Sequence, residues 1–518
     1  MHPRPRDLVI VEASGKVDFL TRKLANIGIP ALVMATVGHV ADSPPTLFPL
    51  GLDSRLNETS YLPKPGKASL LLRLHDAARL AGRVYLATDD DQEGDVIAYD
   101  LATLMPDCAS KMYRVRLRAL SEDELSRAFT GDLSQDFETP SRNGRCRRIL
   151  DRAIGGSFSE LVTPQKVVIG RVQSALLASL AEYSAPLGEF NLSVMSGDGI
   201  YRCAVDVDTL DRLNQLQLIQ QNLKKGQAMA QALAPIERSC GDPWGYEDIV
   251  LEASLKLNIE IKDAAQGLQT AYENGLVSYP RARANGYTVD AISVCSELAK
   301  RNRIGFDPTR MRKRSDDDGT GAPHESPRPL DGCLVLGRPL SVLGTPEAVA
   351  VLVARHVMAC GQVESVKRLL VTASGEEFIF SMPTQRPRRP WKSNEDSDGF
   401  TPWTPAQSVL KFMSIRKLGR PSTIVDHVNR FLGRDLVDSV FALTPKGERW
   451  LSHARDAGLT AETSRQIELA LEGPIESPAA TARYLLGQHG LLEKVLLKIR
   501  QDKSDLNNHA AHSYQAPA

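Results

Sequence analysis

The strongest constraint on the fold is an alternation of apolar runs and helical patterns in the N-terminal part of the chain. Residues 8–11 form a short apolar run, and apolar side chains follow at helical spacing over 17–24. The run 84–87 and a helical pattern over 95–104 repeat this order. Because such alternation is typical of parallel sheets covered by helices, we expect a mostly parallel α/β domain here.

Other patterns follow along the chain. Residues 141–182 are expected to be helical, and 186–206 and 366–381 have the alternating apolar runs of strands. Residues 246–330 are expected to be helical with one short strand at Leu276–Tyr279. Two polar stretches, residues 312–321 and 383–398, indicate linkers or loops.

Composition sets the broad class. A chain of 518 residues is expected to hold two to four domains, and 42% hydrophobic with 24% charged residues is typical of a soluble globular enzyme. Neither a membrane-length apolar run nor a signal peptide is evident, so a cytoplasmic location and no membrane partner are expected. The seven cysteines form no CxxC pair, which argues against a zinc ribbon or a disulfide framework.

The formal net charge is zero, because 63 Lys and Arg balance 63 Asp and Glu. This excludes a simple basic protein that coats nucleic acid. It leaves room for local phosphate-binding clefts, because affinity depends on where the arginines cluster.

An acidic cluster lies where the apolar run 84–87 ends. Asp89, Asp91 and Glu93 alternate, so an extended backbone lets their side chains converge. Divalent cations relieve the repulsion of close carboxylates, and Mg²⁺ prefers such oxygen ligands. Glu12 and Lys16 follow the first apolar run and reach the same sheet edge. The alternative is an acidic loop that caps a helix.

A second candidate centre is Tyr279, which follows a helix closed by Asn274-Gly275 and precedes Pro280-Arg281. With an arginine two positions on, a phosphate can be held between the two side chains. The hydroxyl has an ordinary pKa of about 10, so a nearby cation favours the phenolate. The alternative is a tyrosine of the core or of a strand end.

Arginines recur at helical spacing over 145–154, where Arg145, Arg148 and Arg152 share one face. A solvated basic face is the alternative. The string 418–423, LGRPST, is expected to open a helix with Ser/Thr capping character, which makes a phosphate site. No P-loop is present, so no nucleotide is implied.

These strings together resemble those of a known family. VIVEASGK followed by ATDDDQEGDVIAYDL resembles a toprim domain, and LVSYPR resembles the active-site motif of type IA DNA topoisomerases, particularly of the topoisomerase III branch. RRILDRAIGGSFSELV, GRVQS, HESPRP and LGRPST resemble further family strings, in family order. Two departures are Gln92, where the family has Arg, and Ala282-Arg283, where it has Ser/Thr-Asp.

The resemblance implies roles for individual residues. It makes Tyr279 the nucleophile of a 5′-phosphotyrosine link, Arg281 its electrostatic partner, and Glu12 and Lys16 helpers in proton transfer and phosphate positioning. It assigns Mg²⁺ to Asp89, Asp91 and Glu93. The implied DNA-binding residues are Arg114, Arg147, Arg148, Asp151, Arg171, Gln173, Ser174, Gln269, Ser278, His324, Arg420, Ser422 and Thr423.

The resemblance also implies a fold: a toprim α/β domain, helical domains and a β-rich arch, arranged as a toroid. We expect a monomer that acts on single-stranded and negatively supercoiled DNA, relaxing or decatenating it without ATP. The expected divisions are a toprim domain (1–153), a helical DNA-groove domain (154–185 and 386–518), the arch (186–245 and 331–385) and a helical domain with the tyrosine (246–330).

Two rival functions stay open from the residues alone. A Mg²⁺-dependent toprim nuclease or primase-like enzyme needs only the acidic cluster and leaves the Tyr279, GRVQS and GRPST strings without a purpose. A non-catalytic protein that binds single-stranded DNA is the other, and it fits the two departures, Gln92 and Arg283.

Overall fold

The N-terminal alternation of apolar runs and helices forms the expected parallel sheet. In the computed structural model its order is β2-β1-β5-β6, and each neighbouring pair is parallel. The strands are β1 (Asp7–Val11), β2 (Ala31–Ala35), β5 (Val84–Leu86) and β6 (Met112–Arg114). Because all four run the same way, the segments that follow β1, β2 and β5 start from one edge of the sheet.

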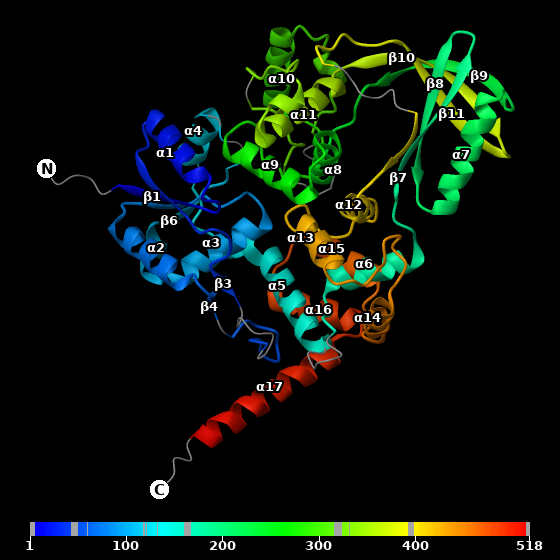
Figure 1. Cartoon of the computed structure of the whole chain (residues 1–518). Helices are drawn as coiled ribbons and strands as arrows, with labels where there is room; N and C mark the ends of the chain where they lie inside the picture. The colour runs from blue at the N-terminus through cyan, green and yellow to red at the C-terminus, as the bar shows by residue number, and fades with distance from the viewer. Residues whose placement is uncertain are drawn as a thin grey trace. The chain divides into compact units, whose positions relative to one another are not determined.

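Helices cover both faces of this sheet (Figure 1). Leu8 and Ile10 of β1 pack with apolar side chains of α2 (Ala68–Leu80) and α3 (Gln92–Leu104). On the other face lie α1 (Lys16–Asn26) and α4 (Glu122–Thr130), and Phe129 of α4 meets the ring of Tyr85 edge-on at 5.1 Å. The smaller elements are β3 (Ala41–Asp42), β4 (Leu62–Pro63) and the 3-10 helix η1 (Pro106–Lys111).

A helical layer completes this unit, which comprises residues 1–178 and 446–518. The long helix α5 (Glu138–Phe158) contacts α3, α16 and α17. The expected helix over 141–182 is divided into α5 and α6 (Arg171–Glu182). The C-terminal helices are α14 (Pro445–Asp456), α15 (Ala461–Ala470), α16 (Pro478–Gln488) and α17 (Leu492–Ser513).

The second unit, residues 179–445, contains an antiparallel sheet of order β12-β7-β8-β11-β10-β9. The helix α7 (Leu210–Lys224) lies beside this sheet (Figure 1). Its apolar side chains pack on the core of the sheet, as expected for strands that alternate apolar and polar residues. The strand predictions over 186–206 and 366–381 are confirmed. The strands are β7 (Gly188–Ser196), β8 (Gly199–Val207), β9 (Met229–Ser239), β10 (Val363–Ala373), β11 (Glu376–Gln385) and β12 (Gly399–Pro402).

The rest of this unit is helical, as expected for 246–330. The strand predicted at Leu276–Tyr279 is reduced to one bridge, Val277 with Pro329, because prolines on both sides lack the N–H that a longer ladder needs. The helices are α8 (Tyr246–Leu257), α9 (Ile261–Glu273), α10 (Val289–Asn302), η2 (Pro308–Arg310), η3 (Leu340–Val342), α11 (Thr345–Cys360), α12 (Pro405–Ile415) and α13 (Ile424–Leu432).

The structure describes residues 6–42, 50–59, 61–117, 120, 122–131, 133–159, 167–314, 324–330, 332–391 and 398–513, without the side chains of 123 and 503–513. The expected linkers fall partly outside these ranges, at 315–321 and 392–397. Within the described ranges, no helix is both long and apolar enough for a membrane span. The mixed fold class is confirmed, and the four-domain division stays a prediction.

Candidate functional site

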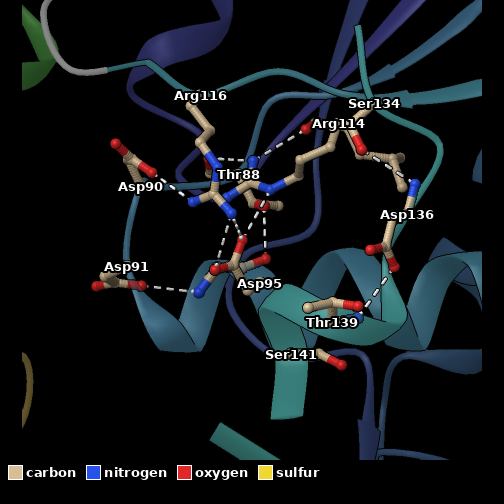
Figure 2. A network of polar contacts seen from close by, with 12 residues as sticks. Thr88, Asp90, Asp91, Asp95, Arg114, Arg116, Ser134, Asp136, Thr139 and Ser141 are labelled. Carbon is tan, nitrogen blue, oxygen red and sulfur yellow. Dashed lines mark hydrogen bonds and ion pairs between the residues drawn. The ribbon is translucent and has the colours of Figure 1, made fainter. Parts of the chain in front are cut away.

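The acidic cluster forms a tight turn between β5 and α3. Asp91 is the N-cap of α3, and its Oδ1 accepts a hydrogen bond of 2.7 Å from the N–H of Gly94. The hydroxyl of Thr88 donates to the carbonyl of Gly94 at 2.6 Å, which closes the turn from the other side. A Cβ on Gly94 would lie 2.0 Å from the carbonyl oxygen of Asp89, so only glycine fits. Figure 2 shows Asp91 and Thr88 on this turn.

Each carboxylate of the expected metal set has a separate partner in the structure. Asp89, only 2% exposed, accepts a hydrogen bond from the buried ammonium of Lys16. Glu93 Oε2 lies 2.7 Å from Nε2 of His39. Asp91 caps the helix, so the capping alternative describes one of the three carboxylates correctly. Lys16 is therefore brought to the cluster, as expected.

His39 is a site residue that the sequence analysis missed. It follows β2, which neighbours β1 in the sheet, and it reaches the edge where the acidic turn follows β5. The backbone continues the pairing beyond the strands, because Val37 N donates to the carbonyl of Glu12 at 2.8 Å. A histidine a few residues after an apolar run was the available signal.

A network of arginines and aspartates lies beside the acidic turn (Figure 2). Arg114 is 5% exposed, and its Nε donates to Asp95 at 3.0 Å. Its remaining nitrogens donate to four backbone carbonyls, those of Leu86, Thr88, Asp89 and Val115. These donors hold the end of β5 and the turn in place, and a role of Arg114 in DNA binding stays a prediction.

A further group of possible metal ligands lies in the same domain. His75, Asp107 and Cys108 have ligand atoms within 4.8 Å of one another. Among the described residues, the carboxylates of Asp89, Asp91 and Glu93 do not form a group that is this close. Cys108 belongs to the hydrophobic core, and burial raises the pKa of its thiol. His75 and Asp107 form a surface ion pair at 2.8 Å. These features describe a structural contact better than a metal centre.

The arginine face of α5 is occupied by acidic partners from other segments. Arg148 pairs with Glu58 at 2.7 Å and with the buried Asp100 at 3.0 Å. Arg145 pairs with Glu58 at 3.3 Å. The solvated-face alternative is therefore wrong, because these guanidinium groups hold a neighbouring loop and helix.

The next face of α5 carries Arg147, which is 8% exposed. Its Nη1 lies 2.7 Å from Glu468 of α15, while its buried Nε and Nη2 have no hydrogen-bond partner among the residues that the structure describes. Arg171, at the start of α6, pairs with Asp151 at 2.9 Å and with the same Glu468. Gln173 and Ser174 follow on α6 and are buried. The strings RRILDR and GRVQS thus meet around one glutamate.

The second candidate centre, around Tyr279, belongs to the unit of residues 179–445. Tyr279 is 2% exposed, and its ring centroid lies 4.5 Å from that of His324, with the planes inclined by 37°. Tyr272 of α9 meets the same ring edge-on at 5.7 Å. The structure therefore brings together the tyrosine and the histidine of two separate strings.

The backbone before Tyr279 is fixed by a paired segment. Ser278 N donates to the carbonyl of Arg328 at 2.8 Å, and Arg328 N donates to Ser278 Oγ at 3.0 Å. Arg328 is itself held by Glu325 at 2.8 Å. Ser278 is thus a backbone anchor of the tyrosine segment. Arg328, a buried residue beside it, was not expected from the sequence.

The residues after Tyr279 depart from the family pattern without disturbing the fold. The carbonyl of Ala282 accepts from Tyr246 N at 2.8 Å, which joins this segment to the start of α8. Arg283 is exposed. Burial raises the pKa of Tyr246 to about 12, against the opposing charge of Arg281. Gln269 lies on α9 and donates to Glu273 at 3.0 Å.

The string LGRPST begins α13 as expected, with Thr423 at the N-cap position. Its side chain makes no capping hydrogen bond, which corrects the expected Ser/Thr cap, because the φ and ψ of Thr423 (−129° and −5°) depart from the usual extended cap. Instead the carbonyl of Arg420 accepts from Thr423 N at 3.0 Å and from Ile424 N at 2.8 Å. Arg420 and Ser422 are partly exposed at this helix start.

Known proteins resemble this chain in sequence and in fold. The family model described as Toprim domain matches residues 7–120. The chain is 27% identical over 291 residues to "DNA topoisomerase 1" of Aquifex aeolicus, covering 53% of this chain and 52% of that protein, so it spans about half of that relative's length. The structure of full-length topoisomerase I from Thermotoga maritima matches with a TM-score of 0.67 at 17% identity, covering 94% of this chain and 90% of that one.

The parallel sheet, the acidic turn and the family match define residues 7–120 as a toprim domain. The fold is shared along almost the whole chain with the Thermotoga maritima topoisomerase I, and part of the chain is similar in sequence to a DNA topoisomerase 1; membership of the type IA family stays a prediction. The topoisomerase III branch stays a prediction.

Proposed function

We propose that this chain cuts and rejoins single strands of DNA through Tyr279, and so changes DNA topology without ATP. The observation that carries the proposal is the contact of Tyr279 with His324, at a ring-centroid distance of 4.5 Å, on a backbone anchored through Ser278. A buried tyrosine beside an imidazole and near an arginine is equipped for nucleophilic attack on a phosphate. A core tyrosine needs no such neighbours.

In the proposed reaction Tyr279 Oη attacks phosphorus and gives its proton to solvent. The bond from phosphorus to the 3′-oxygen breaks, a 5′-phosphotyrosine forms, and the leaving 3′-oxygen takes a proton, for which Glu12 is the proposed source. Another strand passes, and the 3′-hydroxyl then attacks the phosphotyrosine and returns its proton to Glu12, while the bond from phosphorus to Tyr279 Oη breaks and the tyrosine regains a proton from solvent. Because the covalent link conserves the energy of the broken bond, the cycle needs no ATP. Arg281 and His324 are proposed to stabilise charge on the phosphate.

Mg²⁺ is the proposed cofactor of the acidic turn. Asp89, Asp91 and Glu93 offer hard oxygen donors on one turn, and the partners of two of them, Lys16 and His39, are cationic or can become so. This donor set fits a divalent ion, because the positive charge of the ion would compensate the carboxylates in place of Lys16 and His39. When bound, Mg²⁺ would neutralise charge on a phosphate held nearby.

Single-stranded and negatively supercoiled DNA are the proposed partners, and the chain is proposed to act as a cytoplasmic monomer. The most suggestive contact group for DNA is Arg147, because a buried guanidinium with two donors that find no acceptor among the described residues suits a phosphate oxygen. Arg148, Asp151, Arg171, Gln173 and Ser174 are proposed to position that region. Gln269, Ser278, Arg420, Ser422 and Thr423 are proposed to line the strand's path in the other unit.

A plasmid relaxation assay with Mg²⁺ tests the proposal, with the wild-type chain compared with Tyr279→Phe. The phenylalanine keeps the ring contacts and removes only the hydroxyl. Relaxation by the wild type and its loss in the variant support the proposal. Nicking that survives in Tyr279→Phe would point to a toprim nuclease, and an inactive wild type that still binds single strands would point to an accessory protein.

A further inference from the structure

Asp90 lies between two of the proposed metal ligands in sequence, yet its carboxylate has a different partner. Its Oδ1 lies 2.5 Å from Nη1 of Arg116, and the side chain of Asp90 is 3% exposed. Nη2 of the same Arg116 lies 2.9 Å from Asp95. Figure 2 shows Arg116 reaching both carboxylates from the segment that follows β6.

The ion pairs of Arg116 with Asp90 and Asp95 reduce the negative charge of the acidic turn. Residues 89, 90, 91, 93 and 95 all carry carboxylates, whereas residue 92 is a neutral glutamine. Arg114 is buried, and its guanidinium is divided between Asp95 and backbone carbonyls. Arg116 is 35% exposed, and among the described residues its ion pairs are with Asp90 and Asp95. It is therefore the residue whose charge can be altered without removing the backbone contacts of Arg114.

We propose that Arg116 is a positioning residue that keeps Asp90 out of the metal-binding set and sets the affinity of the acidic turn for a divalent cation. The inference rests on the metal site of the proposed function. With Arg116 present, Asp90 is neutralised and turned aside, so that Asp89, Asp91 and Glu93 remain for the ion. Without it, a fourth carboxylate faces the ion, and the turn holds one more uncompensated negative charge.

The experiment measures Mn²⁺ affinity of the full chain without DNA, by electron paramagnetic resonance of the free ion. Arg116→Gln is expected to bind Mn²⁺ about tenfold more tightly, because one positive charge is lost beside the site. Asp90→Asn is expected to bind about threefold to tenfold more weakly, because one negative charge is lost. The double variant should return to within about twofold of the wild type, since its net charge is restored.

Lys23→Gln is the matched control, because Lys23 pairs with Glu122 at 2.9 Å in the same domain, two turns of α1 beyond Lys16. It should leave the affinity within about twofold. Circular dichroism checks the fold of each variant. If Arg116→Gln does not fold, Asp90→Asn still tests the inference with Arg116 intact.

Several results would overturn the inference. Unchanged affinity in both single variants would reduce the bridge to a structural ion pair. A loss above about 100-fold in Asp90→Asn that the double variant does not recover would make Asp90 a ligand. Absence of Mn²⁺ binding to the wild type would contradict both this inference and the metal site of the proposed function. Relaxation that depends on Tyr279 would still support strand cleavage by the tyrosine.

Discussion

The imidazole of His324 lies against the phenol ring of Tyr279, with ring centroids 4.5 Å apart. Both side chains are almost fully buried, at 7% and 2% exposed. The contact joins two strings that are distant in the chain, and it gives the proposed nucleophile a neighbour that can donate a proton or a hydrogen bond.

His324→Ala is expected to lower cleavage of a single-stranded oligonucleotide by about 100- to 1,000-fold, the usual contribution of one donor to a charged transition state. Quantified phosphotyrosine formation under single-turnover conditions measures this. His453→Ala, on α14, serves as the control and should retain cleavage. A rate within about twofold of the wild type would assign His324 to packing alone.

Ser278→Ala is expected to destabilise the unit that carries Tyr279 by about 1–2 kcal/mol. The hydrogen bond from Arg328 N to Ser278 Oγ, 3.0 Å long, is buried, and its loss leaves the N–H unsatisfied. Thermal unfolding measures the change. Ser296→Ala is the control, because its hydroxyl donates to the carbonyl of Ile292 within the same helix, α10. Equal melting temperatures for the two variants would contradict the anchoring role.

Arg147→Ala is expected to weaken binding of a single-stranded oligonucleotide about tenfold and to reduce the salt dependence of binding by about 0.7 in log–log slope, corresponding to one phosphate. The reason is the pair of buried donors, Nε and Nη2, for which the described part of the chain supplies no acceptor. Fluorescence anisotropy at several salt concentrations gives both numbers. Arg465→Ala, an exposed arginine on α15, should change neither. An unchanged slope in Arg147→Ala would rule out the phosphate contact.

His356 is expected to make the unit of residues 179–445 less stable in acid. Burial lowers the pKa of His356 to about 4, and its ring stacks on Trp244 at 3.5 Å. The folded state therefore binds fewer protons than the unfolded state between pH 6.5 and 4, so stability is full above about pH 6.5 and falls as the pH drops. The expected loss between pH 7 and 4.5 is about 2 kcal/mol.

Comparison of the wild type with His356→Phe isolates this effect, because the phenylalanine preserves the stacking and cannot titrate. The melting temperature of the wild type should fall more than that of the variant between pH 7 and 4.5. Parallel pH profiles would contradict the prediction.

The local sequence pattern was sufficient to predict where the strands end and that a turn follows β5. A fully buried run followed by carboxylates, with Asp91 in a capping position, is defined within a few residues of sequence. The meeting of Lys16 with Asp89 also follows, because parallel strands β1 and β5 end at one edge.

Contacts between side chains that are far apart in the chain could not be predicted from the sequence. Whether Arg114 turns inward depends on Asp95 and on backbone carbonyls that only the folded sheet supplies. The partners of Arg147 and Arg148, Glu468 and Glu58, lie far along the chain, and no periodicity relates them. The contact of His39 with Glu93 requires the strand order β2-β1-β5, which helical and strand patterns do not define.

The glycine in the acidic turn has a mechanical consequence. Since a Cβ at residue 94 would lie 2.0 Å from the carbonyl oxygen of Asp89, the start of α3 packs directly against the peptide of Asp89. We therefore expect a displacement of the helix to move the peptide that carries the Asp89 carboxylate. The position of α3 and the position of the Asp89 carboxylate are therefore expected to change together.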